Sequence, residues 1–295
     1  MKELILTEKS NPNSKNIDLE STSGILRIIN NEDKLVAIVV EKELEVISKA
    51  VDLISESFLA GGSLLYFGAG TSGRLGVLDA SECPPTFGVN KNMVRGYIAG
   101  GDKALREAVE GAEDIYEDGE RDLIMSAVGP DDVVAGISAS GNAPYICGVL
   151  SKAKELLIST VAISCNKKAK IGEIADIHIA PEVGSEVVTG STRLKAGTAQ
   201  KMVLNMLTTA SMIKTGKTYH NYMIDVMPTN KKLVDRATRI IVDLTGVSYD
   251  IAGEYLIKAD NSVKVATVMI KSGVDKDQAK QLILQNNGIL RKVIG

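Results

Sequence analysis

Short apolar runs alternate with helical patterns along the middle of the chain. The apolar runs predict five strands, near Leu64–Phe67, Val94–Ala99, Asp132–Ser138, Thr160–Ser164 and Ile177–Ala180. The segments between them predict helices near Gly73–Ser81, Lys103–Glu117, Pro144–Leu157 and Lys168–Ala175. Strands that alternate with helices are typical of right-handed βαβ units. We therefore expect an α/β fold in which helices cover both faces of a parallel sheet.

Purely helical patterns flank this region on both sides. Before it, apolar spacing predicts helices near Ser21–Asn30 and Asp33–Leu59, separated by Asn31-Glu-Asp. After it, a long helix is expected near Leu194–Lys214, and the residues from about 240 onward predict a small bundle of three helices. The expected domains are 1–60, an N-terminal arm with helices; 61–235, the α/β domain; and 236–295, the C-terminal three-helix bundle.

A glycine-rich turn follows the first predicted strand. Gly68, Gly70 and Gly73 let the backbone turn sharply, and Thr71 or Ser72 can cap the helix that follows. A strand, a glycine turn and a helix N-terminus together form an anion site, because unpaired N–H groups and the helix dipole point into the turn. The two hydroxyl groups favour a phosphate monoester of the kind that a sugar phosphate carries.

Other interpretations of this turn remain open. Gly68-x-Gly70-x-x-Gly73 formally matches the dinucleotide fingerprint, but the first acid after the second strand, Asp102, comes later than that fingerprint expects. A nucleoside-triphosphate loop needs Gly-Lys-Ser/Thr, whereas Arg74 follows Gly73 here. A tight turn that binds nothing is the third alternative.

A second hydroxyl-bearing loop follows the third predicted strand, directly before a helix that starts near Pro144. Two such loops at the carboxyl ends of one parallel sheet can converge on a single phosphate. The candidate substrate-binding residues are the hydroxyls of Thr71, Ser72, Ser138 and Ser140, the amides of Gly73 and Gly141, and Asn142 for the sugar.

Carboxylates are the remaining acid–base candidates, because the two histidines lack the partners of a nucleophilic triad. Glu82 stands just before Pro84-Pro85, which we expect to end its helix, and Glu113 is expected on the next helix. Glu82 would lie ~14 Å from the helix start, so it reaches the cleft only if the chain folds back or a second subunit completes the site. Periodicity alone does not distinguish these two from Glu107, Glu110 or Asp114. For either residue the alternative is a solvent-exposed acid on a helix, with no catalytic role.

Composition narrows the class of protein. The 34 Lys and Arg against 37 Asp and Glu give a net charge of −3, which offers no general attraction to nucleic acid. No signal peptide and no membrane-spanning run is visible, and three cysteines without metal-ligand spacing fit buried reduced thiols. We expect a cytoplasmic protein that needs neither a metal nor another cofactor.

Several motifs taken together resemble one family. These are Gly68-Ala-Gly-Thr-Ser-Gly-Arg-Leu-Gly, Asp79-Ala-Ser-Glu-Cys-Pro-Pro, Ala99-Gly-Gly, Glu110-Gly-Ala-Glu-Asp114 and Gly190-Ser-Thr-Arg-Leu-Lys-Ala-Gly-Thr-Ala-Gln-Lys201. As a set they resemble the N-acetylmuramic acid 6-phosphate etherases, whereas the glycine turn alone is shared by many sugar isomerase (SIS) domains. The resemblance implies a three-layer SIS sandwich on a five-stranded parallel sheet, plus the helical bundle, and a homodimer with sites near its interface.

The resemblance also implies an activity. Etherases of this family cleave the D-lactyl ether of N-acetylmuramic acid 6-phosphate, giving N-acetylglucosamine 6-phosphate and D-lactate in cell-wall sugar recycling. Glu82 matches the family's proton donor and Glu113 its second active-site carboxylate. Arg193 and Lys195 could close the pocket or serve the dimer, with a surface ion pair as the alternative. A sugar-phosphate-binding regulator and an aldose–ketose isomerase on the same fold are the competing functions.

Overall fold

The computed structural model describes residues 6–226, 228 and 230–295. Contacts divide the chain into two compact units, one of Met1–Ser81 with Asn92–Thr208 and one of Glu82–Lys91 with Thr209–Gly295. The three-part division expected from the sequence stays a prediction. Residues 1–5 of the predicted N-terminal arm lie outside the described residues.

A five-stranded parallel sheet forms the centre of the first unit, in the order β2–β1–β3–β4–β5. Its strands are β1 (Leu64–Gly68), β2 (Val94–Ile98), β3 (Val133–Ile137), β4 (Ser159–Ile163) and β5 (Ile177–Ile179). All five predicted strands are confirmed, with ends that differ by one residue. The strand order reverses between β1 and β3, and ligands of open α/β sheets bind at such a switch point.

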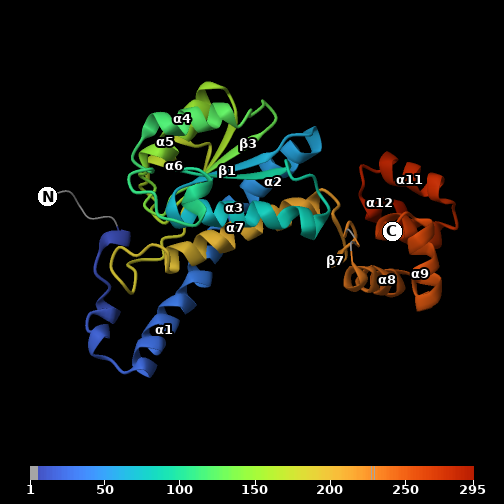
Figure 1. The fold of residues 1–295 in the computed structure, drawn as a ribbon, viewed down its shortest axis with the longest axis horizontal. Coiled ribbons are helices and arrows are strands. Elements are labelled where there is room, and N and C mark those ends of the chain that lie inside the picture. Colours follow the sequence, from blue (N-terminus) through green and yellow to red (C-terminus); the bar gives the residue numbers. More distant parts are fainter. Residues whose placement is uncertain (1–5, 227, 229) are drawn as a thin grey trace. The chain divides into compact units, whose positions relative to one another are not determined.

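Helices cover both faces of this sheet, which confirms the three-layer sandwich (Figure 1). Leu65 and Phe67 of β1 are fully buried against α4, α5 and α6, whereas Tyr66 faces α3 and donates to Asp79 at 3.2 Å. Burial of one such side chain stabilises the fold by roughly 1.5–3 kcal/mol. The helices are α1 (Thr22–Glu41), α2 (Leu44–Ala60), α3 (Gly70–Phe87), α4 (Tyr116–Met125), α5 (Pro144–Glu155), α6 (Lys170–Ile174) and α7 (Lys195–Lys214).

The predicted break between the first two helices is wrong. Asn31-Glu-Asp lies inside α1, and the break falls at Lys42 and Glu43 instead. Glu32 is only 5% exposed and forms an ion pair with Lys195, which is 2% exposed. A buried carboxylate with a partner stays inside a helix, so the polar triplet is not a linker. Lys195 is also not part of a surface ion pair.

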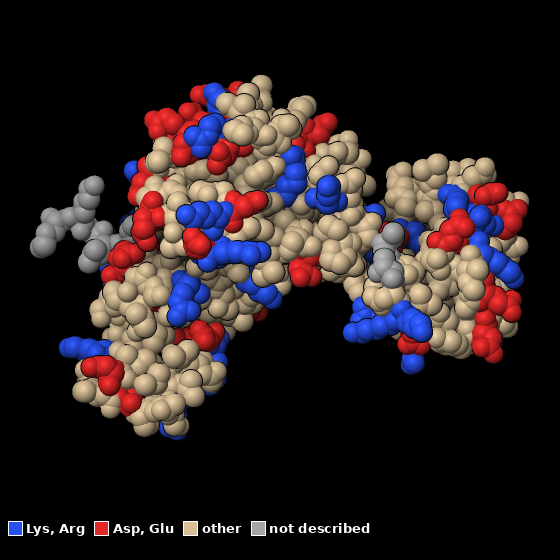
Figure 2. Space-filling model, viewed as in Figure 1, with Lys and Arg blue, Asp and Glu red and all other residues tan. Residues whose placement is uncertain are grey.

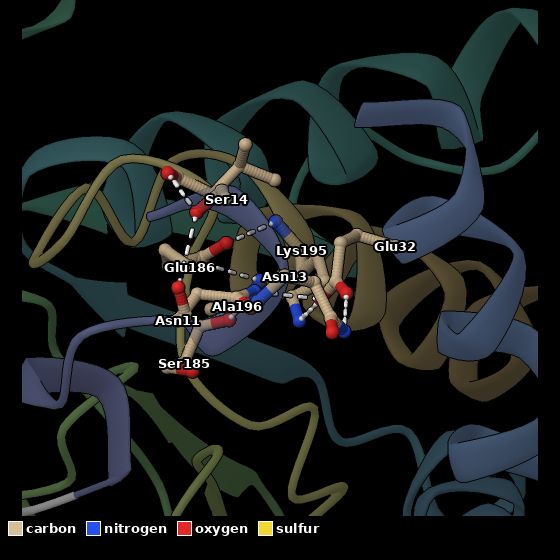
Figure 3. Close-up of polar contacts among 9 residues, drawn as sticks. Asn11, Asn13, Ser14, Glu32, Ser185, Glu186, Lys195 and Ala196 are labelled. Atoms are coloured by element: carbon tan, nitrogen blue, oxygen red, sulfur yellow. Dashed lines mark hydrogen bonds and ion pairs between the residues drawn. The ribbon is translucent and has the colours of Figure 1, made fainter. Parts of the chain in front are cut away.

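A polar cluster around this ion pair attaches the N-terminal segment to the start of α7 (Figure 3). Asn11 and Asn13 each donate to a carboxylate oxygen of Glu32 at 2.8 Å, and Ser14 donates to the carbonyl of Val187 at 2.7 Å. Three short 3-10 helices shape the segment: Leu6–Glu8, Pro12–Ser14 and Ile17–Leu19. The described part of the predicted arm is therefore held by hydrogen bonds to residues far away in the sequence.

The prolines near the end of α3 do not stop the helix, contrary to the prediction. The helix continues through Pro84 and Pro85 to Phe87. Ala80, Cys83 and Phe87 are buried at helical spacing, so packing of this apolar face compensates for the hydrogen bonds that proline removes.

The helix predicted at Lys103–Glu117 is also wrong. A short 3-10 helix, Asp102–Leu105, is followed by irregular backbone up to Ile115, and α4 starts only at Tyr116. The side chain of Arg74 donates to the carbonyl of Leu105 at 3.1 Å and to that of Glu107 at 3.4 Å. These tertiary bonds use carbonyls that a helix would need for its own backbone.

The second unit is helical, with one small hairpin. It contains five helices in the region where the sequence predicted three, so that number is wrong. Asp260 and Asn261 adopt positive φ between two of the helices, which their short polar side chains tolerate, and no glycine marks that break. The elements are β6 (Thr218–Tyr219), β7 (Tyr222–Met223), α8 (Lys231–Thr245), α9 (Tyr249–Lys258), α10 (Val263–Ser272), α11 (Lys276–Gln285) and α12 (Leu290–Ile294).

The surface carries both signs of charge. Lys and Arg are interspersed with Asp and Glu over the face that Figure 2 shows. Among the described residues, no helix combines the length and the apolar character that crossing a membrane requires. All three cysteines, Cys83, Cys147 and Cys165, are buried, as expected.

Replacement of Glu32 by Gln tests the ion pair. Burial raises the pKa of Glu32, but hydrogen bonds from Lys195, Asn13 and Asn11 outweigh it and hold the pKa below its usual 4.5. We expect E32Q to lose roughly 3–5 kcal/mol of unfolding free energy at pH 7, because Lys195 stays buried without its counter-charge. The difference from the original chain should shrink as the pH falls through the folded pKa of Glu32.

Denaturant unfolding between pH 3 and pH 7 measures this difference. Replacement of Glu41 by Gln is the control, since Glu41 is exposed at the end of the same helix. Equal stability losses in E32Q and E41Q would contradict the role of the ion pair.

Candidate functional site

The two hydroxyl-bearing loops lie side by side because their strands pair in register. β1 and β3 are neighbouring parallel strands, and Gly68 at the end of β1 is opposite Ile137 at the end of β3. Both chains therefore leave the sheet at the same edge, at the switch point of the strand order. The predicted convergence of the loops on one region is supported by this register.

Close approach within the first loop requires glycine at two positions. A Cβ at Gly68 would lie 2.5 Å from the nitrogen of Gly73, and a Cβ at Gly73 would lie 2.7 Å from the carbonyl oxygen of Gly68. The helix α3 begins at Gly70, three residues earlier than predicted. The N–H groups of its first turn have no partners within the helix, which makes this turn suitable for an anion.

The hydroxyls of this turn differ in their surroundings. Thr71 is half-buried, whereas Ser72 is 6% exposed and donates its hydroxyl to the side-chain carbonyl of Gln200 on α7 at 3.0 Å. Gly73 is buried behind them, and its N–H donates to the carbonyl of Ala69 at 3.2 Å. The Gly73 amide, predicted as a phosphate ligand, is thus used within the turn.

The second loop is braced by its own hydrogen bonds. Ser138 accepts the N–H of Gly141 at 3.1 Å, and Ser140 accepts the N–H of Asn142 at 3.3 Å. Neither hydroxyl donates to an acceptor within the described chain, so both remain available as donors. The side chain of Asn142 accepts the N–H of Lys170 at 3.2 Å and donates to the Ser140 carbonyl at 3.4 Å. This structure thus gives Asn142 and the Gly141 amide a role in shaping the loop.

A pocket of about 190 Å³ opens beside the first loop. Its wall includes Ala69 and Gly70 from the turn, Arg74 from the first turns of α3, and Glu110 and Glu113 from the irregular segment before α4. The pocket therefore combines the start of a helix, a guanidinium group and two carboxylates.

Glu113 lies next to the second loop as well. Its backbone carbonyl accepts the N–H of Tyr145, in the first turn of α5, at 3.0 Å. Burial raises the pKa of the Glu113 carboxyl, and the nearby charges of Asp114 and Glu110 raise it further. Although Glu113 is exposed as a whole residue, it therefore holds its proton more tightly than an ordinary glutamate, as an acid–base group requires. Sequence periodicity left this choice open; position at the pocket favours Glu110 and Glu113 over Glu107 and Asp114, and the raised pKa points to Glu113.

Glu82 does not line this pocket. It is exposed on the part of α3 that belongs to the second unit, and the helix continues past it without folding back. The structure therefore brings together the two loops and Glu113, whereas Glu82 is not among the residues that line the pocket.

The start of α7 is already occupied by a carboxylate (Figure 3). Glu186 is fully buried and accepts the N–H groups of Lys195 and Ala196, each at 2.9 Å. Burial raises the pKa of Glu186, although these two bonds oppose the shift. A helix start neutralised in this way does not attract a phosphate, so the first turn of α3 is the better anion site.

Sequence reasoning missed two residues near the site. Arg74 served only to exclude a nucleoside-triphosphate loop, although its place one turn into the helix could have suggested a pocket cation. Gln200 gave no signal of its own, because its contact with Ser72 joins residues that lie 128 positions apart. Within the described ranges, no cluster of three or more His, Cys, Asp or Glu side chains could hold a metal ion.

Comparisons with known proteins agree with this geometry. The chain matches the SIS domain over residues 104–210, the N-terminal SIS domain of glucokinase regulatory protein over 45–154, and the C-terminal lid domain of that protein over 220–276. It is 51% identical over 292 residues to the N-acetylmuramic acid 6-phosphate etherase of Clostridioides difficile, covering 99% of this chain and 96% of that protein. The etherase of Glaesserella parasuis is 55% identical over 284 residues, covering 96% of this chain and 93% of that protein.

A solved structure shows the same fold at low identity. It is that of a candidate phosphosugar isomerase involved in capsule formation from Bacteroides fragilis, with a TM-score of 0.50 and 20% identity. The match covers 68% of this chain and 96% of that one.

Replacement of Gly73 by Ala tests the tight turn. The new Cβ would meet the Gly68 carbonyl and the Ile98 side chain at 2.7 and 2.6 Å. We expect a loss of roughly 1–3 kcal/mol of unfolding free energy, because the turn must shift. Thermal unfolding measures this loss.

Replacement of Gly253 by Ala is the matched control. Gly253 lies within α9, and a Cβ there meets no atom within 4 Å. That variant should be as stable as the original chain or more stable by up to about 1 kcal/mol. A G73A variant that behaves like G253A would show that the turn tolerates a side chain.

Proposed function

The chain belongs to the family of N-acetylmuramic acid 6-phosphate etherases, and from this premise we propose how its residues cleave the D-lactyl ether of that sugar phosphate. The products are N-acetylglucosamine 6-phosphate and D-lactate. The observation that carries this proposal is the identity of 51% and 55% to two such etherases over nearly the whole chain.

The phosphate group binds at the first turn of α3. The N–H groups of that turn, the hydroxyls of Thr71 and Ser72, and the hydroxyls of Ser138 and Ser140 surround it. The adjacency of β1 and β3 supports this placement, since it brings both loops to one edge of the sheet. The guanidinium of Arg74 adds positive charge at the neighbouring pocket.

The sugar reacts in its open form, where the C1 aldehyde acidifies the C2 proton. Glu113 removes that proton, the C3–oxygen bond breaks, and an acid protonates the departing lactate oxygen. Water then adds to the unsaturated aldehyde, placing its oxygen on C3 and returning a proton to C2. The raised pKa of Glu113 supports its role as the base, because a stronger base abstracts a weakly acidic proton more readily.

Glu82 supplies the acid for the lactate oxygen. Because Glu82 does not line the pocket of its own chain, we assign this role to the Glu82 of a second copy in a homodimer. We assign the protein to the cytoplasm, which fits its three free, buried cysteines. The resemblance of the chain to the etherases supports both carboxylate assignments.

Assay of D-lactate distinguishes this function from its competitors. An etherase releases D-lactate from N-acetylmuramic acid 6-phosphate, whereas a non-catalytic regulator binds the sugar phosphate and releases nothing. An aldose–ketose isomerase would convert the sugar and leave the ether intact. D-lactate in proportion to the substrate consumed supports the proposal, and binding without release would refute it.

The two glutamates can be assigned to subunits by mixing variants. Glu82→Gln and Glu113→Gln should each slow lactate release at least about 100-fold, because each removes a proton-transfer group. When the two variants are unfolded together and refolded, a shared site should recover about a quarter of the original activity per subunit. Each mixed dimer then has one site with both glutamates intact.

Binding of N-acetylglucosamine 6-phosphate to each single variant is the control for folding. Full activity in either variant would exclude that residue from the chemistry. Failure of the mixture to recover activity would place both carboxylates in one subunit.

The acidic limb of the pH–rate profile tests the role of Glu113. A base must be ionised, so kcat/KM should rise with pH through the pKa of Glu113, which lies above the ordinary 4.5. Glu110→Gln and Asp114→Asn each remove a negative charge that raises this pKa, so the limb should move to lower pH in both variants.

Glu117→Gln is the matched control, because Glu117 is an exposed acid that does not raise the pKa of Glu113. Its profile should coincide with that of the original chain. A limb that stays in place in E110Q and D114N, or moves to higher pH, would contradict the assignment of Glu113 as the base.

A further inference from the structure

The side-chain amide of Gln200 is buried and only half satisfied. Gln200 is 1% exposed on α7, and its carbonyl oxygen accepts the hydroxyl of Ser72 at 3.0 Å. Its Nε2 group has no hydrogen-bond partner among the described residues. Few other buried side-chain nitrogen or oxygen atoms of the described residues lack a partner. A buried N–H without a partner is costly. Its presence therefore calls for an explanation, because it lies beside the first turn of α3, where we propose that the phosphate binds and which we call the phosphate turn.

The packing of α7 brings this amide against the phosphate turn. Gly197 lies one turn before Gln200, and a Cβ at Gly197 would lie 3.4 Å from a methyl carbon of Thr71. Gly197 and Gln200 thus share one face of α7, and this face lies against Thr71 and Ser72 of the first turn of α3.

In the present orientation of the Gln200 amide, the hydroxyl proton of Ser72 points to Gln200 and is not available to a phosphate oxygen. Ser72 donates to Gln200, so its hydroxyl has no proton left for a phosphate oxygen. Half a turn of the amide exchanges its oxygen and nitrogen, after which Nε2 donates to the Ser72 oxygen and frees the Ser72 proton. The exchange also gives one N–H of Nε2 an acceptor in Ser72, whereas Nε2 has no partner in the present orientation.

We propose that Gln200 is a positioning residue for the phosphate group. Its amide holds the Ser72 proton in the ligand-free protein and, after rotating, directs that proton to a phosphate oxygen in the sugar-phosphate complex. The inference rests on the proposed function, because it requires the phosphate to bind at the first turn of α3. Gln200 acts through Ser72 and does not touch the reacting carbon atoms.

A double-mutant cycle on the full-length chain tests this role. Gln200→Leu keeps the size of the side chain and removes both hydrogen-bonding groups. We expect Q200L to raise the KM for N-acetylmuramic acid 6-phosphate about three- to tenfold, the effect of one hydrogen bond, with kcat changed less than about twofold. In a Ser72→Ala background the same substitution should change KM less than about twofold, because the hydroxyl that Gln200 directs is gone.

Two further variants keep the test decisive. Gln200→Met retains the length of the side chain and serves in the same cycle if Q200L folds poorly. Thr208→Val is the control, because Thr208 is buried on the same helix, two turns beyond Gln200, and bonds Asp79 instead of the phosphate turn. T208V should leave KM unchanged.

The outcomes separate this proposal from the proposed function. Equal effects of Q200L on KM with and without Ser72, or an effect on kcat alone, would overturn the role of Gln200 while S72A still raises KM. If S72A itself leaves both KM and the binding of N-acetylglucosamine 6-phosphate unchanged, the phosphate does not bind through Ser72, and the role of Gln200 falls with that placement; D-lactate release tests the etherase function separately.

Discussion

The register between β1 and β3 is the constraint on which the rest of the site depends. These parallel strands end opposite each other, at Gly68 and Ile137, so the two loops that follow them leave the sheet at one edge. A shift of one residue in this pairing would turn every side chain of one strand to the other face. The full burial of Leu65 and Phe67 on one face and of Tyr66 on the other resists such a shift.

The buried polar cluster at the start of α7 positions the other side of the site. Glu186 caps the helix, and Glu32 pairs with Lys195 at its first residue. Buried charges are costly unless they are bonded, and here Glu32 accepts from Asn11, Asn13 and Lys195, while Glu186 accepts two backbone N–H groups. Because these contacts fix where α7 begins, they also fix where Gln200 meets Ser72 on the adjacent α3. The N-terminal segment, distant in sequence, thereby takes part in shaping the phosphate turn.

The sequence predicted the sheet well because each strand is a short apolar run between turn residues, and burial on both faces leaves that pattern unmistakable. Helix boundaries failed where a distant partner decides the structure. Glu32 is helical because Lys195, 163 residues away, neutralises it, and Lys103–Glu117 is mostly irregular because Arg74 binds its carbonyls. Motifs indicated the hydroxyl loops and Glu113 as candidates, but the half-satisfied amide of Gln200 exists only in the folded chain.

A crystal structure of the complex with N-acetylglucosamine 6-phosphate tests the central claim most directly. Our account predicts that the phosphate oxygens lie within hydrogen-bond distance of the first turn of α3, Ser72 and Ser138, with a carboxylate oxygen of Glu113 near C2 of the sugar. A phosphate bound away from the edge where β1 and β3 end would contradict it.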